Sequence, residues 1–541
     1  MSVKRNWFTS FAIVCCEILL AYALFSIIAD MAVGKSYPFI WYGGIILLLA
    51  AALIVVQCAS RLAARTTLLP LKPEGERKLM LAERIAMGAV LMVSAVLRIW
   101  VITQLPIAPS SDFETYYQVA KLLSEGTLSA SGYSGYIAEF PHVIGFPFVL
   151  SLLFAITGPS VTAGLYLNAA FSLFSVYLTY RIARTLGGRL AGMLALLAAA
   201  FWPSQILFGA ILSSEPVFTC LLLLSIRLFI YLYNYPVLLE NRESAMFLCF
   251  TLGVLIALSN AIRPLAIIWL AAVLLCILPF RKSFDKNERM LNGRLSRAAC
   301  QGWFMSLVIC ASFLIFSQLI SASISGTIAY KLPGAGVSFG YNLMVGVNTE
   351  SKGTWNQQDA DFFAEVFHAT NSPEAAHRAS IEVAVPRILS NPAGVLNLAS
   401  EKYTLLWKND DFAETWTKLF LEQQGGLSPQ RQKLISGLTS CNDYFYLLGV
   451  FFSAVYGLRL LKQRKPGGAQ AMVLLFVGTA ILHMLLEHQN RYHYHMLPVF
   501  AILGALGISS LFRQKVIEFR EARLNKTGPQ LIPNEKQTHP H

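Results

Sequence analysis

The chain has 541 residues, of which 55% are hydrophobic and only 13% charged, and its mean hydropathy is +0.54. This composition excludes an ordinary soluble globular protein and predicts a membrane protein with several crossings. The formal net charge of +13 would favour a nucleic-acid partner only if the basic residues clustered on one soluble face. They lie between apolar segments instead, so we interpret them as topology signals and expect no nucleic-acid partner.

The nine cysteines have no spacing typical of a disulfide framework or a metal site. All except Cys441 lie in or beside apolar segments. The chain also lacks a glycine-rich nucleotide-binding loop in a strand–helix context. We therefore expect neither a metal nor a cofactor.

Thirteen apolar segments follow one another along the chain, and most are long enough for a spanning helix. The first begins after Lys4 and Arg5 and is too long for the core of a signal peptide, so we expect it to remain as an anchor. The segments cover about 7–29, 39–60, 84–105, 142–158, 160–180, 190–208, 215–233, 245–260, 264–280, 303–321, 444–461, 470–486 and 492–512.

Lysine and arginine are concentrated in short connections, which the positive-inside rule places in the cytoplasm. The long polar segment 106–141 has Lys121 as its only base, and both it and the second long polar segment, 322–443, are expected outside. The basic connections are 61–84, 281–299, 459–466 and the tail from 513.

Thirteen crossings would put the strongly basic connection 281–299 outside, so one segment between 142 and 180 is expected not to cross. Segment 142–158 is the best candidate because it is short, begins with His142 and contains Gly145 and Pro147. The predicted fold class is an all-α polytopic membrane protein. It has about 12 transmembrane helices plus one re-entrant or juxtamembrane helix, two outer loops with short helices, and both termini in the cytoplasm.

This topology divides the chain into five parts. They are an N-terminal transmembrane hairpin with its cytoplasmic loop (1–83), a catalytic transmembrane module (84–321) with the first outer loop 106–141, a large outer-loop subdomain (322–443), the C-terminal transmembrane helices (444–512) and a cytoplasmic tail (513–541).

Residues 110–126, with the sequence SSDFETYYQVAKLLSEG, bring a carboxylate to the predicted outer membrane surface. Asp112 starts a short amphipathic helix, with Tyr116 on its apolar face. A carboxylate in this position can deprotonate a hydroxyl that attacks a lipid-borne substrate. The structural alternative is a capping box formed by Ser111 and Glu114, in which Asp112 merely favours a helix N-terminus.

Further polar groups fall at the same predicted membrane level. Arg263 and Arg491 follow short polar runs, and their guanidinium groups can bind a phosphate, although Arg263 can alternatively extend to lipid headgroups. Glu215 is a candidate for substrate binding, and its alternative role is that of an acid that favours the start of a helix. Arg98 needs a partner or a phosphate in the third apolar segment. The candidate substrate-binding residues are Glu114, Tyr116, His142, Glu215, Asn260, Arg263, His488, Arg491 and Tyr492.

Six sequence stretches carry a resemblance to a known group of enzymes. They are SSDFETYYQVAKLLSEG, FPHVIGFPFVLSLLFAITG, AFWPSQILFGAILSSEPVF, ALSNAIRPLAIIWLA, GYNLMVGVNTESKGTWN and EHQNRYHYHMLPVFAILG. Their order, spacing and common membrane side, over about 84–512, resemble the membrane-embedded glycosyltransferase superfamily C. Within it, the chain looks like bacterial relatives of protein O-mannosyltransferases and lipid A aminoarabinose transferases.

The resemblance implies that a monosaccharide moves from a polyprenyl-phosphate carrier to a hydroxyl acceptor on the outer face of the cell membrane. Asp112 stands where the family has its catalytic acidic residue. Phe113 separates Asp112 from Glu114, whereas the family often has two adjacent acids, and in a helix this spacing puts the two carboxylates about 200° apart. Pro141 is followed by His142 where the family usually has a second proline.

The residues fit an inverting reaction in which Asp112 takes the acceptor proton and cations stabilise the leaving phosphate. Arg263 and Arg491 are the candidate cations. One alternative is an oligosaccharide ligase or polymerase, and another is a non-enzymatic transporter or flippase. Transport finds little support in the sequence, which has no internal repeat and no matching pair of broken helices. The candidate acceptors are a protein, a surface polymer and a glycolipid.

Overall fold

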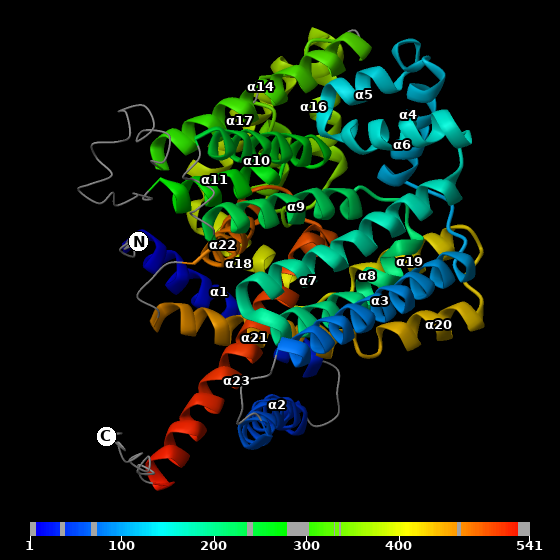
Figure 1. Ribbon diagram of the computed structural model, residues 1–541. Helices are drawn as coiled ribbons and strands as arrows, with labels where there is room; N and C mark the ends of the chain where they lie inside the picture. The colour runs from blue at the N-terminus through cyan, green and yellow to red at the C-terminus, as the bar shows by residue number, and fades with distance from the viewer. Residues whose placement is uncertain are drawn as a thin grey trace, which may run out of the picture.

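The computed structural model describes residues 7–32, 38–66, 73–234, 242–278, 302–328, 330–334, 337–462 and 467–527. Across these residues the regular structure is helical and contains no strand (Figure 1). Eight of the described helices are long and apolar enough to cross a membrane, or nine if one bent pair counts as a single span. The all-α polytopic architecture is confirmed, whereas the number of twelve crossings stays a prediction.

Every predicted apolar segment falls on a helix. The helices on these segments are α1 (Trp7–Ala32), α2 (Pro38–Thr66), α3 (Pro73–Gln104), α6 (Gly145–Thr157), α7 (Val161–Ala200), α9 (Glu215–Asn234), α10 (Arg242–Ile262), α11 (Ala266–Ile277), α14 (Gly302–Ile328), α21 (Asn442–Lys462), α22 (Gln470–Leu485) and α23 (Leu497–Thr527). The basic connection 281–299 lies outside the described residues.

Helix α7 contains most of the predicted segment 160–180 and the first part of 190–208, and it reverses direction between them. Gly188 has φ 80° and ψ −168°, a conformation that interrupts a helix and suits glycine. Arg98 of α3 donates to Ser172 Oγ at 3.0 Å and to the carbonyl oxygen of Ala200 at 3.1 Å, so the two halves of α7 meet at one side chain. A straight helix would separate Ser172 and Ala200 by about 40 Å. We conclude that α7 is a helical hairpin, and that Arg98 ties its arms together rather than binding a phosphate.

The first long polar segment, 106–141, forms α4 (Asp112–Glu125) and α5 (Tyr133–Glu139), and α6 follows it. The pair Tyr133–Glu139 and Pro141–Thr157 is bent by 109°, the geometry of a broken span or a re-entrant loop. At the start of α6, a Cβ on Gly145 would lie 2.0 Å from the carbonyl oxygen of Ala261. A glycine is therefore required there, and this close approach brings α4–α6 against the end of α10.

The second outer segment has two differently packed halves. Its helices are α15 (Gly340–Gly346), α16 (Gln357–Thr370), α17 (Pro373–Ser390), α18 (Pro392–Trp407), α19 (Phe412–Gln423) and α20 (Pro429–Thr439). The first half has a small core of its own that includes Met344, Phe363 and Phe367. Trp407 and Phe420 of the second half belong to the main core. The second half is thus part of the helical bundle that carries the site.

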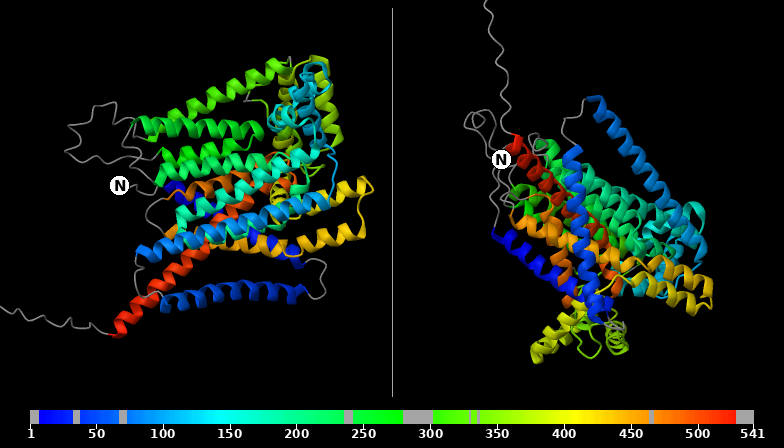
Figure 2. Two further views of the ribbon diagram at one scale, coloured as in Figure 1. Left: turned by 45° about the vertical axis from the view of Figure 1, so that its right-hand side comes forward. Right: turned by 90° about the horizontal axis from the view of Figure 1, so that it is seen from below.

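The N-terminal helices pack on the C-terminal part of the chain. Helix α1 packs mainly on α21 and α22, and α2 packs mainly on α23. Figure 2 (left) shows α4–α6 and much of the second outer segment gathered at one end of the long helices, opposite the end where the N-terminus lies.

Candidate functional site

Four charged side chains from distant parts of the sequence form one cluster. Arg491 Nη2 lies 2.5 Å from Asp112 Oδ2, and Arg263 Nη1 lies 2.6 Å from Glu215 Oε1. Glu215 also lies 3.8 Å from Arg491 Nε and so links the two pairs. Asp112 and Glu215 begin α4 and α9, Arg263 follows α10, and Arg491 lies in a 3₁₀ helix, η5 (Asn490–Met496), between α22 and α23.

Arg491 is buried and contacts two aromatic rings. Its guanidinium carbon lies 4.6 Å from the centre of the Phe113 ring and 5.1 Å from that of Trp416, within the range of cation–π contacts. Among the described residues, Arg491 Nε and Nη1 and Glu215 Oε2 find no hydrogen-bond partner. Buried donors and acceptors without partners are costly, so this cluster has unused capacity to bind a polar ligand.

Asp112 is the accessible member of the cluster, with a side chain that is 43% exposed while that of Arg491 is 4% exposed. The predicted capping box is absent, since the side chain of Ser111 makes no cap hydrogen bond. Ser111 instead has φ 54° and ψ −134°, a conformation that costs a non-glycine residue about 1–3 kcal/mol. Glu114 is exposed and lies outside the cluster, as the spacing of the two acids predicts.

Arg263 points into the cluster rather than toward lipid headgroups. Its side chain is only 15% exposed and lies above the ring of Tyr492, with the guanidinium carbon 5.3 Å from the ring centre. The same side chain donates to Ser214 Oγ at 3.4 Å. Tyr492 therefore acts as a platform for one arginine, and Arg263 and Arg491 reach the same carboxylate of Glu215 from two sides.

A buried network holds η5, and with it Arg491, in place. His493 Nε2 and Asp410 Oδ1 lie 3.1 Å apart, and Asp410 Oδ2 accepts hydrogen bonds from Trp202 Nε1 at 2.7 Å and Ser204 Oγ at 2.6 Å. The sequence analysis missed Asp410 and the aromatic residue Trp416. The adjacent acids at 410 and 411, directly after an apolar helix pattern, are the signal that marks the first of them.

The remaining predicted residues have other surroundings. Tyr116 is buried, with its ring edge-on to Phe113 at 6.2 Å. Asn260 Oδ1 accepts a hydrogen bond from the backbone N–H of Ile267 and so fixes the start of α11. His142 is exposed, beside Phe140.

His488 is buried next to the cluster without contacting it. Burial, together with the nearby charge of Lys402, lowers the pKa of His488 to about 4, so its ring is neutral at pH 7. The structure thus brings together Asp112, Glu215, Arg263, Arg491 and Tyr492 and leaves Glu114, His142, Asn260 and His488 outside this cluster. Among the described residues, no group of three or more His, Cys, Asp or Glu side chains is placed to hold a metal ion.

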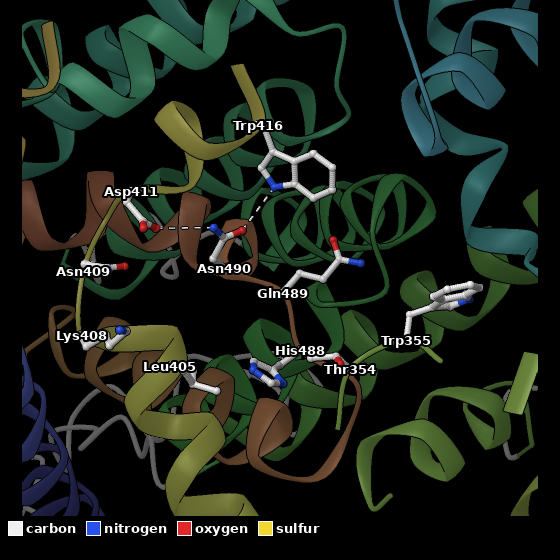
Figure 3. A pocket seen from close by; sticks show the side chains of 10 residues that line it. All are labelled: Thr354, Trp355, Leu405, Lys408, Asn409, Asp411, Trp416, His488, Gln489 and Asn490. Atoms are coloured by element: carbon white, nitrogen blue, oxygen red, sulfur yellow. Dashed lines mark hydrogen bonds between the residues drawn. The ribbon is translucent and has the colours of Figure 1, made fainter. Parts of the chain in front are cut away.

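A cavity of about 420 Å³ adjoins two residues that are next to the cluster, and Figure 3 shows its lining. One lining residue, Trp416, also contacts the guanidinium of Arg491. Another, Asn490, directly precedes Arg491 in the chain. Its lining residues are Thr354, Trp355, Leu405, Lys408, Asn409, Asp411, Trp416, His488, Gln489 and Asn490.

Comparison with models of known protein families and with curated proteins gives no match. Among solved structures, the oligosaccharyltransferase of Archaeoglobus fulgidus in complex with zinc and sulfate is similar over 80% of this chain and 50% of its own, with 14% identity and a TM-score of 0.41. The archaeal oligosaccharyltransferase AglB of the same organism, in complex with an inhibitory peptide and a dolichol-phosphate, is similar over 82% of this chain and 52% of its own, with 13% identity and a TM-score of 0.39. This chain thus spans about half the length of those chains, and at such TM-scores the likeness carries no argument about fold or reaction.

Proposed function

We propose that the protein is an inverting glycosyltransferase that moves a monosaccharide from a polyprenyl-phosphate carrier to a hydroxyl acceptor on the outer face of the cell membrane. The observation that supports this most is the pairing of the accessible carboxylate of Asp112 with the buried guanidinium of Arg491 at 2.5 Å. A base that is open to an acceptor stands beside a buried cation with unused donors, and this is what attack on a phosphate-linked sugar requires.

In the proposed reaction, a carboxylate oxygen of Asp112 takes the proton of the acceptor hydroxyl. The acceptor oxygen then forms a bond to the anomeric carbon while the bond from that carbon to the phosphate oxygen breaks. The leaving polyprenyl phosphate gains one negative charge. Arg263 and Arg491 stabilise it, because both guanidinium groups lie in the same buried cluster.

The formal charges of the cluster sum to zero before the donor binds, because two arginines face the carboxylates of Asp112 and Glu215. An incoming phosphodiester adds one negative charge and competes with Asp112 for Arg491. Displacement of Asp112 from the ion pair frees the oxygen that must accept the proton, so donor binding prepares the base. We therefore expect the donor to bind before the acceptor reacts.

Polyprenyl phosphate is expected to bind the purified protein, and Arg263→Ala should weaken this binding roughly ten- to hundredfold because one charge-assisted contact is lost. Binding is measured by titration of polyprenyl phosphate in detergent. Arg378→Ala is the matched control, since that arginine is 63% exposed and, among the residues that the structure describes, pairs with its neighbour on the same helix, Glu374. Equal affinities for the wild type and the Arg263 variant would remove Arg263 from the phosphate site.

We further propose twelve crossings, with 142–158 held at the outer face and both termini inside. This topology predicts that a cysteine introduced as Met290→Cys, outside the described residues, is protected from a membrane-impermeant thiol reagent in intact cells. It should react once the cells are opened. Strong labelling of position 290 in intact cells would place this connection on the outer side and contradict the proposed topology.

A further inference from the structure

We propose that the cavity of about 420 Å³ that Trp416 connects to the charged cluster is the acceptor site and that it takes a neutral saccharide, so that the acceptor hydroxyl belongs to a sugar. This inference rests on the proposed function and names the acceptor class for the same site. The volume lies within the range of small-molecule pockets.

The lining combines aromatic faces with planar polar groups. Trp355 precedes α16 and Trp416 lies in α19, and Figure 3 shows Gln489 between these two indoles. Asn409 and Asn490 add amides. Indole faces pack on the C–H faces of sugar rings, and amide groups donate to and accept from neighbouring hydroxyls.

The composition of the lining disfavours a lipid chain. Leu405 is the only aliphatic side chain among its ten residues, so the lining offers aromatic faces and polar groups rather than an aliphatic groove for an acyl or prenyl chain. The lining also brings together donors and acceptors in similar number, as a polyhydroxyl ligand needs.

The charges of the lining disfavour an anion. Lys408 is the only lysine or arginine in it, and its ammonium group lies 2.9 Å from the carboxylate of Asp30. Asp411 faces the cavity and accepts from Asn490 Nδ2 at 3.5 Å. Phosphate-bearing acceptors would therefore meet a paired lysine and a carboxylate, whereas a neutral sugar can use both as hydrogen-bond partners.

The wall that carries Trp355 is rigidly supported although the indole itself is 56% exposed. The buried Lys402 donates from Nζ to the carbonyl oxygen of Gly346 at 2.8 Å and packs below Gly353, and the backbone N–H of His488 donates to Gly353 at 3.3 Å. Burial lowers the pKa of Lys402 to about 7, although the nearby Glu487 opposes this shift. An exposed tryptophan on a fixed support is a preorganised binding surface.

The position of the cavity connects it to the reaction. Trp416 lines the cavity, and its ring also packs against the guanidinium of Arg491. Arg491 in turn pairs with Asp112. Trp416 Nε1 also donates to Asn490 Oδ1 at 3.3 Å, which fixes the indole plane. Two side chains, Trp416 and Arg491, thus connect a sugar in the cavity to the proposed base, Asp112.

The test is saturation-transfer NMR on the purified full-length protein in detergent, with a panel of methyl glycosides of neutral hexoses, pentoses and N-acetylhexosamines. At least one glycoside should receive saturation from the wild type. Trp355→Ala should weaken its binding by roughly tenfold, since a stacking face is lost. Trp100→Ala is the matched control, because this indole is similarly exposed but does not line the cavity.

Three results would overturn the assignment. They are no saturation of any glycoside by the wild type, a signal that Trp355→Ala leaves unchanged, and a signal that saturating polyprenyl phosphate abolishes, which would give the cavity to the lipid carrier. Asp112→Asn separates this inference from the proposed function. That variant should retain glycoside binding even if the assignment of Asp112 as the base fails.

Discussion

Replacing Asp112 with asparagine is expected to lower sugar transfer by about 10²–10⁴-fold, the usual contribution of a general base. Asparagine has the same shape, and its side-chain oxygen can still accept the hydrogen bond from Arg491, so folding should be unaffected. The carboxylate that takes the acceptor proton is lost. The measurement is the initial rate of transfer by purified variant and wild type at equal protein concentration.

Glu114→Gln is the matched control for this experiment, because Glu114 lies in the same first turn of α4 but is exposed outside the cluster. Its rate should stay close to that of the wild type. Polyprenyl phosphate should bind Asp112→Asn at least as tightly as the wild type, because a competing negative charge has been removed from beside Arg491. Near-normal transfer by Asp112→Asn would leave Asp112 with only a structural role.

Replacing Arg491 with lysine is expected to lower transfer roughly ten- to hundredfold, because lysine keeps the charge but loses the planar fork and the stacking. The guanidinium contacts the rings of both Phe113 and Trp416, and a compact ammonium group cannot reproduce both contacts. Arg491→Ala should be worse, since it leaves the buried Glu215 with a single cationic partner. Rates at increasing donor concentration separate weaker donor binding from a slower reaction.

Arg378→Lys is the control for the arginine series, since this exposed residue lies on α17 away from the cluster. Thermal unfolding of each variant shows whether the site has kept its fold. An Arg491→Lys protein that unfolds normally and transfers sugar at the wild-type rate would exclude a specific role for the guanidinium.

The sequence predicts much of the charged cluster because membrane helices strongly restrict where ionisable side chains can lie. Asp112, Glu215, Arg263 and Arg491 each stand at the end of an apolar segment, and the basic connections predict that these ends share one side. The structure brings all four together. The separation of Asp112 from Glu114 also follows from helix geometry alone.

The aromatic contacts of Arg491 and the hydrogen-bond network around Asp410 depend on tertiary packing, which local sequence patterns do not encode. Phe113 stands in the sequence merely as a spacer between two acids, and Trp416 lies about 300 residues away in the second outer segment. Asn260 shows the opposite case. Its position at a predicted outer turn makes it a candidate for binding, but its side chain serves the backbone of α11.

The central claim is tested most directly by incubating the purified wild-type protein in detergent with polyprenyl-phosphate sugars and saccharide acceptors, without vesicles or an ion gradient. The account predicts a covalent glycoside whose anomeric configuration is inverted relative to the donor, together with free polyprenyl phosphate. Asp112→Asn should form almost none of this product. Flipping of the same lipids by the protein in liposomes, without any glycoside formed in detergent, would contradict the account and identify a transporter.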